Sequence, residues 1–410
     1  MKRVVVSGVG AISPLGHDWA TVKARLQARR NAVQVMAEWA DYDGLNTKVG
    51  APAAPFTLPA HYNRKTMRSM GRVAVMATRA SELALEDAGL LGDALVKSGR
   101  MGISYGSSAG TPASIGDFGR MIAEKSTEGI NATTYIKMMS HTAAVNIGVF
   151  FGITGRIITT SSACTSGSQG IGYAFEAIQS GKQVAMLAGG AEELDATEAA
   201  VFDTLFATSF KHNDSPELTP RPFDAHRDGL VLGEGACTLV LEELEHAQAR
   251  GARIHAEILA YGTNSDGRHV TQPNMDTMAS AMRLALDDAR LSPVDISYVN
   301  AHGTATDHGD VAEASATHAV FGERIPISSL KSYMGHTLGA CGALEAWISI
   351  EMLRDGWFAP TLNLKEVDPR CAPLDYLMDT GRNIEGEFLM TNNFAFGGIN
   401  TSLILRRWPG

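Results

Sequence analysis

Short apolar runs alternate with amphipathic, alanine-rich stretches along most of the chain. The runs "RVVVSGVG" at 3–10, "RMGISYG" at 100–106 and "KQVAMLAGGAE" at 182–192 are rich in the apolar and small residues typical of buried strands. Between the first two, "RVAVMATRASELALEDAGL" at 72–90 has the apolar spacing of a helix. Strands that alternate with helices predict an α/β fold in which helices cover sheets.

Two segments that lie far apart in the sequence share one pattern. "SSACTSGSQGIGYAFEAI" at 161–178 and "SSLKSYMGHTLGACGALEAWISI" at 328–350 both lead from a Ser-Ser loop through glycine-rich turns into an apolar helix. The similarity suggests an internal duplication in which the two helices are pseudo-symmetric partners at the centre of the molecule. Such a pairing would bring Cys164 close to residues 331–336.

The charged segment around Arg250 is the candidate boundary, because the chain passes there from one set of strands to another. We therefore expect an N-terminal half at residues 1–250, which contains Cys164, and a C-terminal half at residues 251–410. The 410 residues are 45% hydrophobic, which is enough for a large buried core.

Composition narrows the classes of function. The chain has 35 basic and 44 acidic residues and a net charge of −9, which argues against a nucleic-acid-binding protein. Its longest uncharged stretches are rich in Ser, Thr, Gly and Asn, so no membrane-spanning helix is expected. The four cysteines are far apart and form no Cys-x-x-Cys pair, which favours a reducing cytoplasm over a disulfide framework.

One of these cysteines, Cys164, follows a run of Ser and Thr at the start of the first glycine-rich helix. A strand-to-helix turn there would place the thiol near the helix dipole and free backbone N–H groups, which favour a thiolate and an oxyanion. A cysteine is also a small residue that packs well in a core, so the pattern alone leaves a structural role open.

A second candidate segment is "YVNAHGTATDHGDVAEA", in which a buried-looking strand at 296–299 ends in a polar turn. Polar groups that gather at a strand end are typical of a functional site, although a solvated loop has the same composition. We favour His302 over His308 as the functional histidine, because His308 is flanked by Asp307 and a glycine. The same turn contains Thr304, Thr306 and Asp310.

A third segment places Lys331, His336 and Glu345 in an otherwise apolar, glycine-rich sequence. A buried lysine needs a partner, and Glu345 can supply it if the loop folds back. The alternative is an ion pair with a purely structural task.

A fourth segment, "NNFAFGGIN", places Phe394 and Phe396 before two glycines. The glycines allow unusual backbone angles and the close approach of a ligand, although an ordinary β-turn has the same pattern. Cofactor motifs are poor elsewhere, since Ser13 replaces the third glycine of a dinucleotide fingerprint and neither a Walker A nor a His-Glu-x-x-His motif occurs. We expect neither a metal nor a bound redox cofactor.

Together, "SSACTSG", "NAHGTATDHGD", "KSYMGHTLGACGALE" and "NNFAFGGIN", in this order, resemble the β-ketoacyl-acyl-carrier-protein synthases, in particular the elongating synthase I/II group. The resemblance covers nearly the whole chain and includes "VVVSGVGAISPLG", "LAGGAEE" and "RPFDAHRDGLVLGEGA". It implies an α/β thiolase-like fold, in which two similar halves form a five-layered α-β-α-β-α sandwich, and a homodimer or a heterodimer with a paralogue. It also implies an acyltransferase that extends fatty-acid-type chains, with its substrates carried on the phosphopantetheine arm of an acyl carrier protein.

By this resemblance, Cys164 is the nucleophile that holds the acyl chain as a thioester. His302 and His336 correspond to the histidines that bind the malonyl thioester carbonyl and promote decarboxylation. This role suits the residue type, because the resulting enolate needs neutral N–H donors. Lys331 would pair with Glu345 and orient the histidine region.

The resemblance also assigns residues around the substrate. The backbone N–H groups of Cys164 and Phe396 would form the acyl oxyanion hole, and the Phe396 ring would gate the tunnel next to Phe394. Thr304 and Thr306 match residues that hydrogen-bond the pantetheine arm.

Two further roles follow from the resemblance. Asp310 is expected to support the polar turn. Lys65 and Arg68 match basic residues that contact the carrier protein, and their spacing from Arg64 and Arg72 predicts a basic face on one helix. A solvated cationic face without a partner is the alternative.

The chain departs from the family pattern at Asp307, where proline is frequent, and at Ile399, where threonine is frequent. Both positions would lie near the arm tunnel and the gate, so a ketosynthase of a polyketide or polyene pathway on a dedicated carrier stays an alternative. A thiolase is disfavoured, because the C-terminal loop has no second catalytic cysteine. A non-catalytic chain-length factor is disfavoured by the presence of Cys164.

Overall fold

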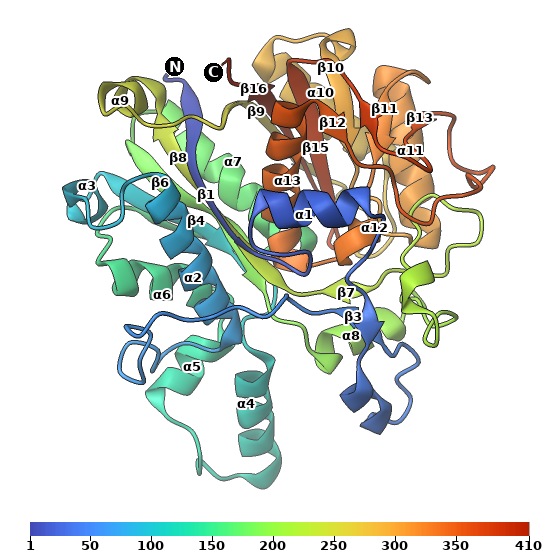
Figure 1. The fold of residues 1–410 in the computed structure, drawn as a ribbon. Coiled ribbons are helices and arrows are strands. Elements are labelled where there is room, and N and C mark those ends of the chain that lie inside the picture. The colour runs from blue at the N-terminus through green and yellow to red at the C-terminus, as the bar shows by residue number, and fades with distance from the viewer. Residues whose placement is uncertain (410) are drawn as a thin grey trace.

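The computed structural model describes residues 1–409 and shows an α/β fold built on an 11-stranded sheet (Figure 1). The main elements of its N-terminal half are β1 (Val4–Ile12), α1 (Trp19–Gln27), α2 (Arg72–Asp87), β4 (Met101–Gly106), α4 (Pro112–Glu124), α5 (Ala132–Met138), α6 (Thr142–Phe151), β5 (Ile157–Thr160), α7 (Ser166–Gln179), β6 (Ala185–Glu192), α8 (Ala196–Asp203), β8 (Gly235–Glu243) and α9 (Leu244–Ala249). Those of the C-terminal half are β9 (Ala256–Ser265), α10 (Met275–Ala289), β10 (Ile296–Asn300), α11 (Asp307–Phe321), β11 (Pro326–Ser328), α12 (Lys331–Met334), α13 (Cys341–Asp355), β13 (Asp375–Tyr376), β15 (Phe388–Ala395) and β16 (Ile399–Arg407). Smaller elements are β2 (Gln34–Val35), β3 (Val49–Ala51), α3 (Ala94–Lys97), β7 (Leu232–Gly233), β12 (Trp357–Phe358) and β14 (Arg382–Asn383).

The two halves repeat one topology. In the N-terminal half the strand order is β5-β4-β6-β8-β1, and in the C-terminal half β11-β10-β15-β16-β9 has the same order, with β13 added at its edge. In each half the first three strands run parallel and the last two are antiparallel to their neighbours. The internal duplication predicted from the sequence is therefore confirmed.

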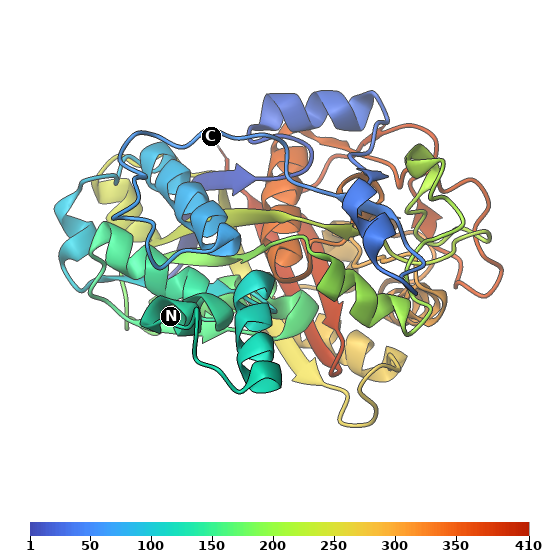
Figure 2. The same ribbon diagram turned by 90° about the horizontal axis from the view of Figure 1, so that it is seen from below.

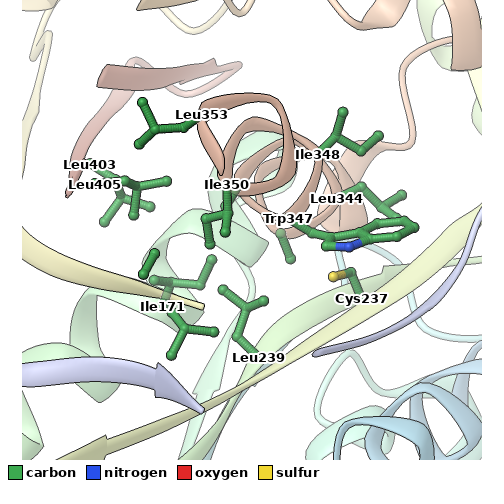
Figure 3. Close-up of a cluster of buried hydrophobic side chains, with 14 of the residues drawn as sticks. Ile171, Cys237, Leu239, Leu344, Trp347, Ile348, Ile350, Leu353, Leu403 and Leu405 are labelled. Carbon is green, nitrogen blue, oxygen red and sulfur yellow. The ribbon is translucent and has the colours of Figure 1, made fainter. Parts of the chain in front are cut away.

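The central helices α7 and α13 lie between the two halves of the sheet. Both helices contact strands of both halves, while α2 and α6 cover the outer face of the N-terminal half and α10 covers that of the C-terminal half (Figures 1 and 2). One apolar cluster joins the central helices to strands of both halves, and in it Ile171 and Trp347 meet Leu239 and Leu403 from β8 and β16 (Figure 3). Separate apolar clusters lie under α2 and α6 and under α10. This arrangement is the thiolase-like sandwich that the sequence predicted.

Glycines allow α7 to pack closely. A Cβ atom at Gly170 would lie 2.5 Å from the carbonyl oxygen of Gly189 on β6, and one at Gly172 would lie 2.5 Å from the ring of Tyr261 on β9. These contacts explain why the helix after Cys164 is rich in glycine.

The halves are not separate bodies, because β1 and β9 pair directly and join them in one sheet. The boundary at residue 250 therefore stays a prediction. Among residues 1–409, no helix is long and apolar enough to cross a membrane.

Candidate active site

Cys164 lies in a short turn of 3-10 helix, Ala163–Thr165, between β5 and α7. Ala163 has a φ of 50°, in the left-handed region that a residue with a side chain rarely adopts. The turn is held by two hydrogen bonds of 2.8 and 2.9 Å that link Thr160 and Ser162 to Ser166. The Cys164 thiol is therefore buried at the start of the central helix α7, where the sequence predicted it.

The two predicted histidines meet at this thiol. His302 follows β10 and His336 follows α12, and their rings are 5.2 Å apart and nearly perpendicular. The Nε2 atom of His336 lies 3.0 Å from the Sγ atom of Cys164. The structure therefore brings together Cys164 and the 331–336 segment, which the duplication predicted.

Hydrogen bonds at the far nitrogens define the state of both rings. The Leu338 N–H donates to Nδ1 of His336 at 3.3 Å, and the Lys331 ammonium group lies 3.2 Å from Nδ1 of His302. Burial, together with the charge of Lys331, holds the pKa of both histidines well below its usual range. With Nδ1 used as an acceptor, the neutral rings carry their protons on Nε2, so each is an N–H donor.

Lys331 is itself fully buried and contacts the carboxylate of Glu345, as predicted. Burial alone would lower the pKa of Lys331, but the Glu345 charge outweighs it and the pKa is raised. Asn393 donates to the second oxygen of Glu345 at 2.7 Å and also lies 3.4 Å from Nδ1 of His302. The lysine is therefore a fixed cation that orients His302.

The state of Cys164 corrects one expectation. We expected the helix start to favour a thiolate, but burial raises the pKa of the Cys164 thiol to about 11. Lys331 and the backbone N–H groups of Phe396 and Cys164 oppose this rise without cancelling it. The same two N–H groups lie at the sulfur, where they can also stabilise an oxyanion.

These groups lie in a cavity of about 520 Å³. Thr304 and Thr306, whose hydroxyl oxygens are 2.9 Å apart, line one side of it. The aromatic rings of Phe394, Phe396 and Phe202 line another, and the last two rings are 5.2 Å apart. The cavity thus has a polar flank in the loop that precedes α11, and an apolar flank formed by α8, the end of β15 and the turn that follows it.

Asp310 supports the polar flank through hydrogen bonds to the backbone of the 304–305 turn. Its carboxylate accepts hydrogen bonds from the backbone N–H groups of Phe223, Thr304 and Ala305, at 2.7 to 3.1 Å, and lies 3.6 Å from Arg227. Burial raises the pKa of Asp310 to about 6. The residue shapes the turn and is not among those that line the cavity.

The two departures from the family pattern lie at the cavity and the gate. Asp307 lines the cavity at the start of α11 and forms a 2.5 Å ion pair with Arg370. Ile399 starts β16 and packs in the same apolar cluster as Phe396. His308 is also at the cavity, but its side chain is 83% exposed.

The predicted basic helix face is wrong. Lys65 and Arg68 are exposed, but residues 60–69 form turns, and α2 begins only at Arg72. Arg72 belongs to a 2.5 Å ion pair with Glu234 and so is not available to a partner. The basic patch is reduced to Arg64, Lys65 and Arg68.

The sequence-based prediction missed two polar residues of the site. Glu313 lines the cavity and accepts hydrogen bonds of 2.7 Å from the backbone N–H groups of His302 and Gly303. Asn393 links His302 to Glu345. The Asp310–Glu313 spacing on one face of α11 was a usable signal for Glu313, whereas Asn393 gave none.

Cys164, His302 and His336 also place one ligand atom each within 4.8 Å of one another, a spacing that could hold a metal ion. The ammonium group of Lys331, next to His302, would repel a cation there. The arrangement favours a nucleophile with two N–H donors over a metal centre.

Comparisons with known proteins agree with this geometry. The family model described as β-ketoacyl synthase, N-terminal domain, matches residues 1–247, and the C-terminal domain model matches residues 255–365. The chain is 37% identical to 3-oxoacyl-[acyl-carrier-protein] synthase 1 of Haemophilus influenzae, with 100% of both chains covered. It is also similar to the crystal structure of a β-ketoacyl synthase from Burkholderia phymatum STM815, at 61% identity, a TM-score of 0.98 and 100% coverage of both chains. The structure of the ishigamide ketosynthase/chain length factor is 32% identical, with a TM-score of 0.89 and 100% coverage of both chains.

Proposed function

The chain belongs to the β-ketoacyl synthase family and is a condensing enzyme of the acyltransferase type, and we propose that Cys164 is its nucleophile in the elongation of fatty-acid-type acyl chains. The observation that carries this assignment is the 3.0 Å contact between the Cys164 sulfur and Nε2 of His336, inside a cavity open to substrate. Lys331 and Glu345 hold the second histidine, His302, beside them.

In the first step, the Cys164 sulfur attacks the carbonyl carbon of an acyl thioester on the carrier protein. The oxyanion that forms accepts hydrogen bonds from the N–H groups of Cys164 and Phe396. The carbon–sulfur bond to the carrier then breaks, and the proton lost by Cys164 ends on the departing carrier thiol. Because the resting thiol has a pKa of about 11, this proton must leave as the attack proceeds.

In the second step, malonyl thioester loses CO₂ and leaves an enolate. Its oxygen accepts hydrogen bonds from the Nε2–H groups of His302 and His336, which are neutral donors and need no proton transfer. The enolate carbon attacks the Cys164 thioester, the bond to sulfur breaks, and the thiol is regenerated with one proton from the medium. The product chain is longer by two carbons.

We propose an acyl carrier protein as the donor of both substrates and a homodimer as the assembly, with a heterodimer as the alternative. Support for a dimer comes from β5, an edge strand whose Ile157 is exposed and which packs against α6, where Val149 is also exposed. Such an edge is a surface that a second strand would cover. The mass of the protein in solution tests this. The four free cysteines fit the cytoplasm as its compartment.

A polyketide or polyene ketosynthase is the second candidate. It is favoured by the similarity to the ishigamide ketosynthase/chain length factor and by Asp307 at the cavity. Analysis of the products made on fatty-acid and dedicated carriers separates the two. No metal or redox cofactor has a place in either reaction as proposed.

The test of the function is acylation of Cys164, followed by condensation. Incubation with acyl-carrier protein should add one acyl group to the intact protein, and malonyl-carrier protein should then yield the β-ketoacyl product. Cys164→Ala should lose both activities, about 10³-fold or more, because no other group supplies the nucleophile. Cys164→Gln, which resembles the acylated cysteine, should still release CO₂ from malonyl thioester. Condensation by the alanine variant would contradict the assignment.

A further inference from the structure

Among residues 1–409, one buried carboxyl group has no hydrogen-bond partner in the protein. Glu198 on α8 is 7% exposed, and neither of its carboxyl oxygens meets a donor or acceptor of the chain. Leaving a buried polar group unpaired is costly, so such a group calls for a ligand or another partner.

The surroundings of Glu198 show which protonation state it has. The charged groups that act on it most strongly, besides burial itself, are all carboxylates, and burial together with them raises its pKa well above the usual range. They are Glu192, Asp195, Glu193 and Glu234. Burial among carboxylates therefore favours the neutral acid form of Glu198, which has one O–H donor and one C=O acceptor to offer.

The neighbouring carboxylates have partners of their own. Glu234 forms an ion pair with Arg72, and Glu192 accepts hydrogen bonds from Ser107 and Ser108. Glu198 differs from them in that the protein leaves both of its oxygens free for another molecule.

Glu198 lies one helical turn before Phe202 on the same side of α8, although it is not itself among the residues that line the cavity. Phe202, one helical turn further on, lines the cavity and packs on the Phe396 ring. Ala199 and Phe202 belong to the same apolar cluster as Cys164.

The expected course of the pantetheine arm puts this position on the acyl side of the nucleophile. Thr304 and Thr306 on the polar flank are where the pantetheine arm is expected, and α8 forms part of the opposite, apolar flank. Because the arm occupies the first flank, an acyl chain on Cys164 must extend along the second, toward α8.

We propose that Glu198 is a specificity-determining residue of the acyl-chain site and that it selects acyl chains that carry a hydroxyl group. A hydroxyl can accept from the acid O–H and donate to its C=O, and so pairs both oxygens at once. A plain alkyl chain leaves both oxygens unpaired and is discriminated against. The inference rests on the proposed function and names the substrate class of that site.

The test is competition between matched thioesters for Cys164. Octanoyl is paired with ω-hydroxyoctanoyl, and phenylpropanoyl with para-hydroxyphenylpropanoyl, each on the carrier protein, and intact mass gives the ratio of the two acyl-enzymes. Wild-type protein should favour the hydroxylated chain in at least one pair. Glu198→Leu should shift that ratio toward the plain chain by about tenfold or more, the effect of one or two buried hydrogen bonds.

Two further variants sharpen the result. Glu198→Gln keeps a donor and an acceptor and should retain a large part of the preference, whereas Val201→Ala, on an exposed position of the same helix, should leave it unchanged. Glu198→Leu should also raise the midpoint of thermal unfolding, because it removes an unpaired buried carboxyl group. A raised midpoint would show that the fold of the variant is intact.

Two outcomes overturn the inference in different ways. Equal acyl ratios in wild-type protein and Glu198→Leu, with both acylated normally, overturn the role of Glu198 and leave the proposed function standing. Failure of every thioester to acylate folded wild-type protein overturns the proposed function and the inference with it.

Discussion

Cys164 and the two histidines respond to burial in opposite senses, and this separates the two half-reactions by pH. Burial raises the pKa of Cys164 to about 11, so the thiolate fraction grows about tenfold per pH unit below that value. Acylation by a small, carrier-free thioester should therefore rise from about pH 7 to 9. Burial lowers the pKa of His302 and His336 well below 6.5, so both stay neutral above it. Malonyl decarboxylation by Cys164→Gln should thus be flat between about pH 7 and 9, as measured by CO₂ release.

The controls for this prediction are single replacements. His302→Ala and His336→Ala should remove most decarboxylation, about 10²-fold, yet leave part of the acyl transfer, because they remove enolate donors and not the nucleophile. His308→Ala, whose side chain is exposed, should remain near wild type. Equal loss of both half-reactions in the histidine variants would contradict the division of roles.

At the scale of single residues, the types of side chain in the site could be predicted from the sequence, but their ionisation could not. Three residues could be singled out in the sequence because polar groups in an apolar segment are seldom buried unless they have a partner or a function. They are Lys331, His336 and Glu345. The raised pKa of Cys164 depends on how deeply the turn after β5 is buried, and this depth is a property of the packed molecule. Asn393 was missed for the same reason, since nothing in the sequence shows that its amide meets Glu345.

Among the elements, the turn between β15 and β16 has the geometry of a movable gate. Gly397 and Gly398 have φ values of 90° and 73°, which only glycine adopts without strain. The turn is tied to the 266–270 loop by hydrogen bonds from Gly397 N–H to Val270 O and from Asp266 N–H to Gly398 O, both of 2.7 Å. These few bonds can open and close without disturbing the strands.

We therefore expect Phe396→Ala to change the rate of acyl transfer several-fold and the rate of malonyl decarboxylation much less, because only the acyl chain must pass the ring. Rapid-quench measurement of each half-reaction with carrier-bound substrates distinguishes the two. Phe394, in the preceding strand, is a matched aromatic outside the turn. A crystal of the acylated enzyme with the 396–398 turn unmoved would count against a gate.

The strands and the long helices followed the sequence pattern, and the 60–69 segment did not. Val4–Ile12, Arg72–Asp87 and Ile296–Asn300 lie where apolar periodicity predicted them. In the turn segment, Asn63 accepts hydrogen bonds from the backbone N–H groups of Lys65 and Thr66, at 2.9 and 3.3 Å. Polar side chains that bind nearby backbone compete with helix formation, and charge spacing alone does not reveal this competition.

For the whole molecule, the repeated strand order explains why Cys164 and the two histidines converge. The chain places Cys164 after β5 and His336 after β11, and these strands are equivalent in the two halves. The sequence hinted at the duplication through two similar segments. The pairing of β1 with β9 that joins the halves could not be predicted, because no local pattern specifies which strands become neighbours.

Delivery of substrate also belongs to this scale, because on the proposed function a chain with a net charge of −9 must attract an acidic carrier protein locally. Lys65→Glu with Arg68→Glu should raise the apparent KM for carrier-bound acyl chains by about tenfold and leave acylation by a small thioester unchanged. Added salt should raise the wild-type KM for the carrier-bound substrate but not for the small thioester, since exposed charges are screened over about 8 Å.

The matched control makes the same change of net charge away from the basic patch. Lys182 and Arg324 are exposed and precede β6 and β11, so they lie at the ends of the parallel strands opposite the turns that follow β5 and β11. Lys182→Glu with Arg324→Glu should therefore leave both substrates near wild type. Because Arg72 is paired with Glu234, the patch has at most three cations, Arg64, Lys65 and Arg68. Reversing the charge of all three should abolish the contribution of the patch to the KM for the carrier-bound substrate. If both substrates respond alike to Lys65→Glu with Arg68→Glu, or neither responds, the carrier docks elsewhere on the surface.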